Sequence, residues 1–123
     1  QIVPADFKVT AKLSKDELIK AIKTTSLFSK TGLFDVTIEF VPPRGIIIKS
    51  TDLQTGENKV ELAGEVSGEE NKITLNYRYL LEGLSALPGN EVSFSLVDPA
   101  NPCLIRSIGK EKEYFYIVMP IKQ

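Results

Sequence analysis

The sequence predicts an α+β domain, and three observations point to this fold class. Apolar and polar residues alternate over several segments in both halves of the chain, as they do in half-buried strands. Two further segments repeat apolar residues at helical spacing, and each follows a residue suited to a helix N-cap. The predicted order of strand, helix and three strands occurs twice. Two such units would pack two helices against antiparallel sheets.

The chain is expected to begin with a strand over residues 6–13, where apolar side chains alternate with polar ones. A helix should follow at once, because Ser14 and Glu17 have the spacing of a capping box. Its buried face is predicted from residues that recur at helical spacing: Leu18, Ala21, Ile22 and Thr25. The opposite face would present a polar stripe of Asp16, Lys20 and Lys23.

Three strands should complete the first half. Residues 34–41 and 46–50 are predicted to form a hairpin, because the turn over residues 41–45 contains two prolines and a glycine. Residues 57–66 are predicted to form one continuous strand, with an acidic outer face that contacts water. The inner face of that strand would hold Val60, Leu62 and Val66.

The second half repeats this order. A short strand over residues 72–75 leads to Asn76, a good N-cap, and to a helix that ends before Pro88. The exposed stripe of this helix would be Arg78, Glu82 and Ser85. Three strand-like segments finish the half: 91–97, 103–108 and 113–121.

An internal duplication explains the repeated order. A shift of 62 positions places the cap Ser14 on the cap Asn76, and a shift of 57 places residues 47–50 on residues 104–107. Two unrelated amphipathic helices could also be aligned in this way, but the shared order and caps favour a duplication. We therefore predict one domain over residues 1–123, with pseudo-symmetric halves at about 5–67 and 68–123.

Composition limits the functions that the chain can have. Of its 123 residues, 42% are hydrophobic and 25% charged, which are ordinary globular values. No apolar run approaches the roughly 20 residues that cross a bilayer, so we expect a soluble, cytoplasmic protein. A net charge of −1 gives no support to nucleic-acid binding by overall attraction. Because residue 1 is Gln1 and not methionine, we expect the chain to be a fragment or a processed product.

Catalysis is not indicated. The chain contains no histidine, which removes the usual general base and the commonest metal ligand. The single cysteine, Cys103, therefore has no histidine partner, and we expect it to be a structural, half-buried thiol. No glycine-rich phosphate loop is present. We expect a non-enzymatic protein without a metal or a cofactor.

Several segments are similar to one known family. They are LNYRYLLEGL at 75–84, VD at 97–98 with NPCLIR at 101–106, and the ending YIVMPIK at 116–122. On these residues the chain resembles the bacterial DNA polymerase III beta subunit, the sliding clamp, and specifically the third, C-terminal domain of its subunit. The resemblance implies the DNA clamp (processivity) fold, in which three similar domains per subunit form a homodimeric ring around duplex DNA.

The resemblance implies that both predicted helix stripes line the hole of the ring. The DNA-facing residues would be Lys20, Lys23 and Arg78. A few cations are enough for this role, because a closed ring retains DNA by topology and weak, salt-sensitive contacts let it slide. A solvated helix face of mixed charge is the alternative interpretation of the same residues.

The resemblance also implies an apolar groove for short, extended peptides of the polymerase III catalytic subunit, the clamp loader, other polymerases and repair proteins. By position, the groove would include Ile2, Ala100, Pro102, Ile117, Met119, Pro120, Ile121, Lys122 and Gln123. The family commonly ends in methionine, arginine and leucine, so Lys122 and Gln123 replace a forked donor and an apolar terminus, and peptide preference should differ. A final strand whose alternate residues face the core is the alternative.

The subunit contact is implied at two places. Leu27 and Phe28 stand where the family has a hydrophobic pair that meets the other subunit. Residues 57–66 would be an edge strand across the same interface, with Glu57 and Glu61 discouraging unspecific pairing. For the pair, a simple loop plug is the alternative.

Two other functions stay open from the residues alone. One is an unrelated α+β interaction module that uses the edge strand at 57–66. The other is a hydrolase with an unrecognised pair of carboxylates.

Overall fold

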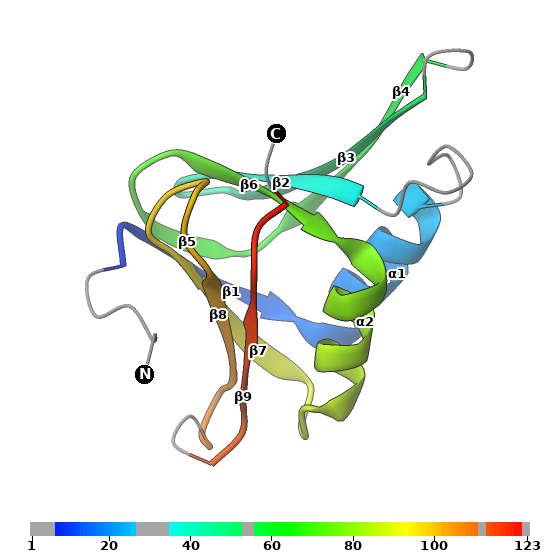
Figure 1. The fold of residues 1–123 in the computed structure, drawn as a ribbon. Coiled ribbons are helices and arrows are strands. Elements are labelled where there is room, and N and C mark those ends of the chain that lie inside the picture. The colour runs from blue at the N-terminus through cyan, green and yellow to red at the C-terminus, as the bar shows by residue number, and fades with distance from the viewer. Residues whose placement is uncertain (1–6, 27–34, 53–55, 111–112, 122–123) are drawn as a thin grey trace.

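The computed structural model describes residues 7–26, 35–52, 56–110 and 113–121, and it confirms the α+β fold class (Figure 1). The two helices are α1 (Lys15–Ser26) and α2 (Tyr77–Ala86). The strands, in chain order, are β1 (Val9–Ser14), β2 (Asp35–Val41), β3 (Gly45–Asp52), β4 (Gly56–Ala63), β5 (Glu65–Gly68), β6 (Asn71–Asn76), β7 (Glu91–Leu96), β8 (Cys103–Ser107) and β9 (Phe115–Val118).

The strands form two antiparallel sheets. One has the order β5-β1-β7-β8-β9 and the other the order β4-β3-β2-β6. Figure 1 shows the two helices side by side at one flank of the sheets. Because each helix turns its apolar face toward the sheets, the opposite polar faces lie on a common outer side.

The order of strands supports two equivalent halves. Exchanging β1 with β6, β7 with β2, β8 with β3 and β9 with β4 converts β1-β7-β8-β9 into β6-β2-β3-β4. Each half therefore adds its first strand to the sheet that holds the last three strands of the other half. The boundary between the halves at residues 67 and 68 stays a prediction.

Both helices begin at the predicted caps. The Glu17 main-chain N–H donates to Ser14 Oγ at 3.3 Å. Asn76 Oδ1 accepts from the N–H groups of Arg78 at 2.9 Å and Tyr79 at 3.3 Å. These side chains satisfy N–H groups that have no partner within the first turn of a helix, which is why each helix starts where it does.

One hydrophobic core joins all the layers. The predicted inner residues of α1 are buried, as are Leu80 and Leu84 of α2. Phe40 of β2 and Phe94 of β7 bring the two sheets together, with ring centroids 5.4 Å apart and an interplanar angle of 69°. This edge-to-face contact is one of the preferred aromatic arrangements.

The prediction of one strand over residues 57–66 was wrong. β4 ends at Ala63, and after Gly64 the chain crosses to the other sheet, where β5 pairs with β1. A Cβ at Gly64 would lie 2.8 Å from the Lys12 carbonyl oxygen, so the crossing needs a residue without a side chain. The alternation of residues continues across the break, which is why the sequence pattern conceals it.

The last strand is shorter than predicted. The expected range was 113–121, whereas β9 spans Phe115–Val118. Pro120 has no N–H to give to a ladder, so pairing with β8 stops before it. The residues beyond β9 leave the sheet and form one wall of the candidate site.

Cys103 is more deeply buried than predicted. It was expected to be half-buried, but its exposed fraction is 0%. Its place on β8 turns the thiol toward the core.

Alkylation should therefore be blocked in the native protein. Burial raises the pKa of the Cys103 thiol to about 12, so at pH 8 its thiolate fraction falls roughly a thousandfold, since each pKa unit is tenfold. We expect iodoacetamide to modify Cys103 at pH 8 only in urea, as followed by mass spectrometry. Comparable rates with and without urea would contradict this burial.

No helix in the described ranges combines the length and apolar character needed to span a membrane.

Candidate peptide groove

The segment after β9 lies against the free edge of β6. The Ile121 main-chain N–H donates to the Thr74 carbonyl oxygen at 2.9 Å. β6 is the outer strand of its sheet in the described chain, so this carbonyl would otherwise face solvent. The bond fixes the position of the C-terminal segment along β6.

The predicted duplication would account for the path of this segment. In the first half, the chain after β4 becomes β5 and pairs with β1, with Lys12 opposite Glu65. The shift of 62 takes Lys12 to position 74. A shift of 56, which also places Val36 on Val92, takes Glu65 to position 121, and the hydrogen bond joins residues 74 and 121. In the predicted duplication, residues 119–121 would be the counterpart of the crossing into β5.

A first hollow lies between the C-terminal segment and α2. Its volume is about 350 Å³, and its lining residues are Asn76, Tyr79, Tyr116, Ile117, Val118, Met119, Pro120 and Ile121. Tyr79 is 59% exposed and Met119 62% exposed, so two large apolar side chains stand open to solvent at its rim. Exposed apolar groups gathered at a hollow are typical of binding surfaces.

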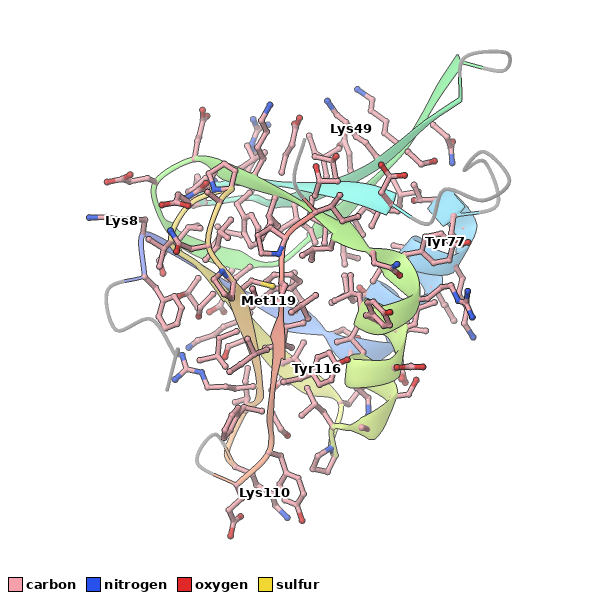
Figure 2. All side chains as sticks on the ribbon, viewed as in Figure 1. Lys8, Lys49, Tyr77, Lys110, Tyr116 and Met119 are labelled. Atoms are coloured by element: carbon pink, nitrogen blue, oxygen red, sulfur yellow. The ribbon has the colours of Figure 1, made fainter. Side chains whose placement is uncertain are left out.

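Tyr116 forms the wall of this hollow nearest the helix. Figure 2 shows its side chain on β9 pointing toward α2. Partial burial raises the pKa of the Tyr116 phenol, and the neighbouring Glu82 and Tyr79 raise it further. The phenol therefore stays neutral at physiological pH, and this wall presents an uncharged surface to a ligand.

A second hollow, also of about 350 Å³, lies on the other side of the segment. Its lining residues are Lys72, Ile73, Thr74, Pro99, Ala100, Pro120 and Ile121. Because Pro120 and Ile121 belong to both hollows, the C-terminal segment is a ridge between them. Together the two hollows form a trough, called here the C-terminal trough.

A turn after β7 supplies the opposite wall of the second hollow. Asp98 Oδ1 accepts from the Ala100 N–H at 2.8 Å, and the Asn101 side-chain amide donates to both carboxylate oxygens at 3.0 and 2.9 Å. These bonds hold the turn without help from the ridge. The wall is therefore formed before any ligand binds.

The structure brings together only some of the predicted groove residues. Those that line the trough are Ala100, Ile117, Met119, Pro120 and Ile121. Pro102 is buried and lines neither hollow. Ile2, Lys122 and Gln123 lie outside the described residues. The trough also includes residues that the sequence did not predict for it: Asn76, Tyr79 and the β6 residues Lys72 to Thr74. Their place in the site depends on the path of the C-terminal segment.

The predicted DNA-facing residues share one side of the molecule. Lys20 and Lys23 are exposed on α1, and Arg78 is exposed on α2, beside acidic residues on each helix. The helices pack against each other, so both stripes belong to one surface of mixed charge.

The predicted subunit-contact residues are described only in part. Glu61 is exposed on β4, the outer strand of its sheet in the described chain. Leu27, Phe28 and the side chain of Glu57 lie outside the described residues.

Within the described ranges, no group of three or more acidic, cysteine or histidine side chains could hold a metal ion.

Comparison with known proteins decides the family. The model of the DNA polymerase III beta subunit, C-terminal domain, matches residues 1–122. The chain belongs to this family. The beta sliding clamp of Synechocystis sp. is 28% identical to this clamp domain in an alignment 125 residues long, which covers 99% of the chain and 31% of the relative.

Solved clamps have the same fold. The crystal structure of the DNA polymerase sliding clamp from Bacillus subtilis superposes with a TM-score of 0.90 at 26% identity, over 98% of this chain and 32% of that one. The DNA polymerase III beta subunit from Thermotoga maritima superposes with a TM-score of 0.92 at 26% identity, over 99% and 33%. This clamp domain thus spans about a third of the length of the relatives that it matches. The resemblance drawn from residues 75–84 and the C-terminal segment is confirmed at the level of the family and the fold.

Proposed function

We propose that this chain is the C-terminal domain of a replicative sliding clamp, and that its trough docks short, extended peptides of replication and repair proteins. The observation that carries the proposal is the C-terminal trough itself, in a chain of the clamp family. Exposed Met119 and Tyr79 offer apolar surface, and the Asp98 turn and the bond of Ile121 to β6 hold the walls in place. Catalysis would belong to the polymerase that the clamp holds, so we propose no catalytic residues here.

Docking in this trough should be of moderate strength. Two or three large side chains buried at about 25 cal/mol per Å² yield several kcal/mol. Part of this gain is offset by the cost of ordering the peptide and of association. A dissociation constant in the micromolar range follows. Such affinity suits a surface that several cytoplasmic partners use in turn.

In the complete protein, we propose that the face of α1 and α2 looks toward duplex DNA. Lys20, Lys23 and Arg78 would contact phosphates, and Asp16 and Glu82 on the same helices keep the attraction small. A few phosphate contacts release few counterions, so they contribute little affinity and let the ring slide along the DNA. Retention would come from the closed ring.

The ring requires a second subunit. We propose that the outer edge of β4, with Glu57 and Glu61, pairs across that contact, and that Leu27 and Phe28 supply its apolar part. Membership of the clamp family favours this arrangement over a free-standing interaction module, because the same edge strand then has a defined partner.

Peptide binding tests the proposal. A fluorescent peptide that contains a glutamine followed by a leucine-phenylalanine pair is titrated with the native gene product, and anisotropy reports the dissociation constant. Met119→Ala removes exposed apolar surface from the trough, and we expect it to weaken binding about tenfold, the size of a typical anchor contact.

Tyr114→Ala is the matched control. Tyr114 is another exposed large side chain, 44% exposed, and it lines neither hollow of the trough. Its replacement should change the dissociation constant less than twofold, on the order of an ordinary surface substitution. Equal binding by Met119→Ala and the unmodified protein would contradict docking at this trough.

A further inference from the structure

The C-terminal trough continues past its second hollow. A third hollow, of about 370 Å³, is lined by Glu39, Phe40, Val41, Glu70, Asn71, Lys72 and Pro99. It shares Lys72 and Pro99 with the second hollow. Since each hollow shares lining residues with the next, the three follow one another along β6. The peptide path proposed above therefore has space to continue beyond the ridge.

The junction between the second and third hollows is held in place by Asn71. Its Oδ1 accepts from the Lys72 N–H at 3.0 Å, and its Nδ2 donates to the Val97 carbonyl oxygen at 2.9 Å. One side chain thus ties the start of β6 to the end of β7, just before the Asp98 turn. The third hollow is a formed part of the fold, with walls that do not need a ligand.

The charges in the third hollow differ from those in the rest of the trough. Lys72 stands at the junction, whereas Glu39 and Glu70 line only the third hollow. Glu39 is matched by Lys49, with 2.9 Å between Oε2 and Nζ. Glu70 is exposed, and no basic group among the described residues comes within ion-pair distance of it. Within the described part of the chain, the Glu70 carboxylate at the far end of the trough is therefore unmatched.

Apolar surface lies next to this carboxylate. Val41 is half-buried and Pro99 exposed, and both line the third hollow. Arginine and lysine combine an apolar stem with a cationic head, so their stems can cover apolar surface while the head meets a carboxylate. The part of the lining that holds Glu70, Val41 and Pro99 thus suits a long basic side chain.

We propose that the third hollow is a specificity site that accepts a basic residue flanking the apolar anchors of a docked peptide, with Glu70 as its charge partner. The inference rests on the proposed function, because it extends the same peptide. It adds a selection among peptides by charge. A partner with arginine or lysine beyond its anchors would bind more tightly than one with glutamate there.

Extended peptides test this selection. The anchor peptide is compared with versions that carry Gly-Arg-Arg or Gly-Glu-Glu at one end or the other, each titrated against the native gene product. We expect the basic extension at one end only to lower the dissociation constant about two- to fivefold relative to the acidic one, as for an exposed ion pair. The gain should shrink as salt is raised.

Two matched variants identify the carboxylate responsible. Glu70→Lys should abolish the preference for arginine, whereas Glu69→Lys makes the same charge change at an exposed neighbour outside the hollow and should keep it. The anchor peptide without extension should bind all three proteins equally. The inference alone would be overturned if the basic extension did not lower the dissociation constant at either end, or lowered it equally at both ends. It would also be overturned if Glu70→Lys and Glu69→Lys lost the preference for arginine to the same extent. Failure of the anchor peptide to bind would instead overturn the proposed function, and this inference with it.

Discussion

Replacing Phe94 with alanine should lower the free energy of unfolding by about 3–5 kcal/mol, the range observed for deleting a buried aromatic side chain. Phe94 is 0% exposed and packs edge-to-face on Phe40 across the two sheets. The cavity would open where the halves meet, and neither sheet can move to fill it without losing contacts elsewhere. Because small domains are stable by only about 5–15 kcal/mol, much of the stability would be lost.

Urea unfolding followed by circular dichroism measures this loss. Phe115→Ala is the matched control, because Phe115 is 47% exposed on β9, and its removal should cost well under half as much. A cycle with Phe40→Ala should show a coupling of about 0.5–1.5 kcal/mol for the ring pair. Equal losses for Phe94→Ala and Phe115→Ala would mean that the sheets are not joined at this contact.

Replacing Gly83 with valine should destabilise the domain by about 1–3 kcal/mol and weaken peptide binding at the same time. A Cβ at Gly83 would overlap the ring of Tyr116, which lies directly on the α2 backbone. The overlap includes the ring carbon nearest the main chain, so the whole side chain must move, and with it a wall of the first hollow.

Ser85→Val serves as the control for Gly83→Val. It puts valine at an exposed position of the same helix. The lower helix propensity of valine is therefore included in the control, whereas the overlap with the Tyr116 ring is not. Urea unfolding should show a larger loss of stability for Gly83→Val than for Ser85→Val. Anisotropy of the anchor peptide should show weaker binding for Gly83→Val only. Adding Tyr116→Ala should recover part of the lost stability. If Gly83→Val had the same stability and peptide affinity as Ser85→Val, the Tyr116 ring would not need a glycine at position 83.

The role of Gly83 could not be predicted from the sequence. The prediction placed the second helix correctly, from Asn76 onward, but gave no role to a glycine inside it. Glycine in a helix costs about 1 kcal/mol relative to alanine, which is a signal of close approach. The signal does not say what approaches. Tyr116 is 33 residues further along the chain, and its contact with α2 depends on the packing of β9.

The strands illustrate the same limit. Alternation predicted β1 correctly as a half-buried strand, because burial of one face imposes a period of two. Alternation also predicted one strand where the structure has β4 and β5. The period of two is unchanged when the chain passes from one sheet to the other at Gly64, so the pattern did not reveal the break. Periodicity records which side is buried and contains no information about which strand is the neighbour.

The groove residues divide in a similar way. Met119, Pro120 and Ile121 were predicted from their resemblance to the family ending, and they do line the trough. Lys72 and Thr74 were predicted only as part of a strand. Their role appears when Ile121 bonds to the edge of β6, a contact between residues far apart in the sequence.

The sequence by itself determined the local elements of this domain: two capped helices, the alternating strands, the order repeated in two halves, and the family to which they belong. These follow from local sterics, capping and the period of burial, all of which act within a few residues. The tertiary structure alone decided the exchange of first strands between the sheets, the ridge of the C-terminal segment on β6, and the three connected hollows beside it. Those features depend on long-range packing, in which each contact is chosen by the shape of the whole core.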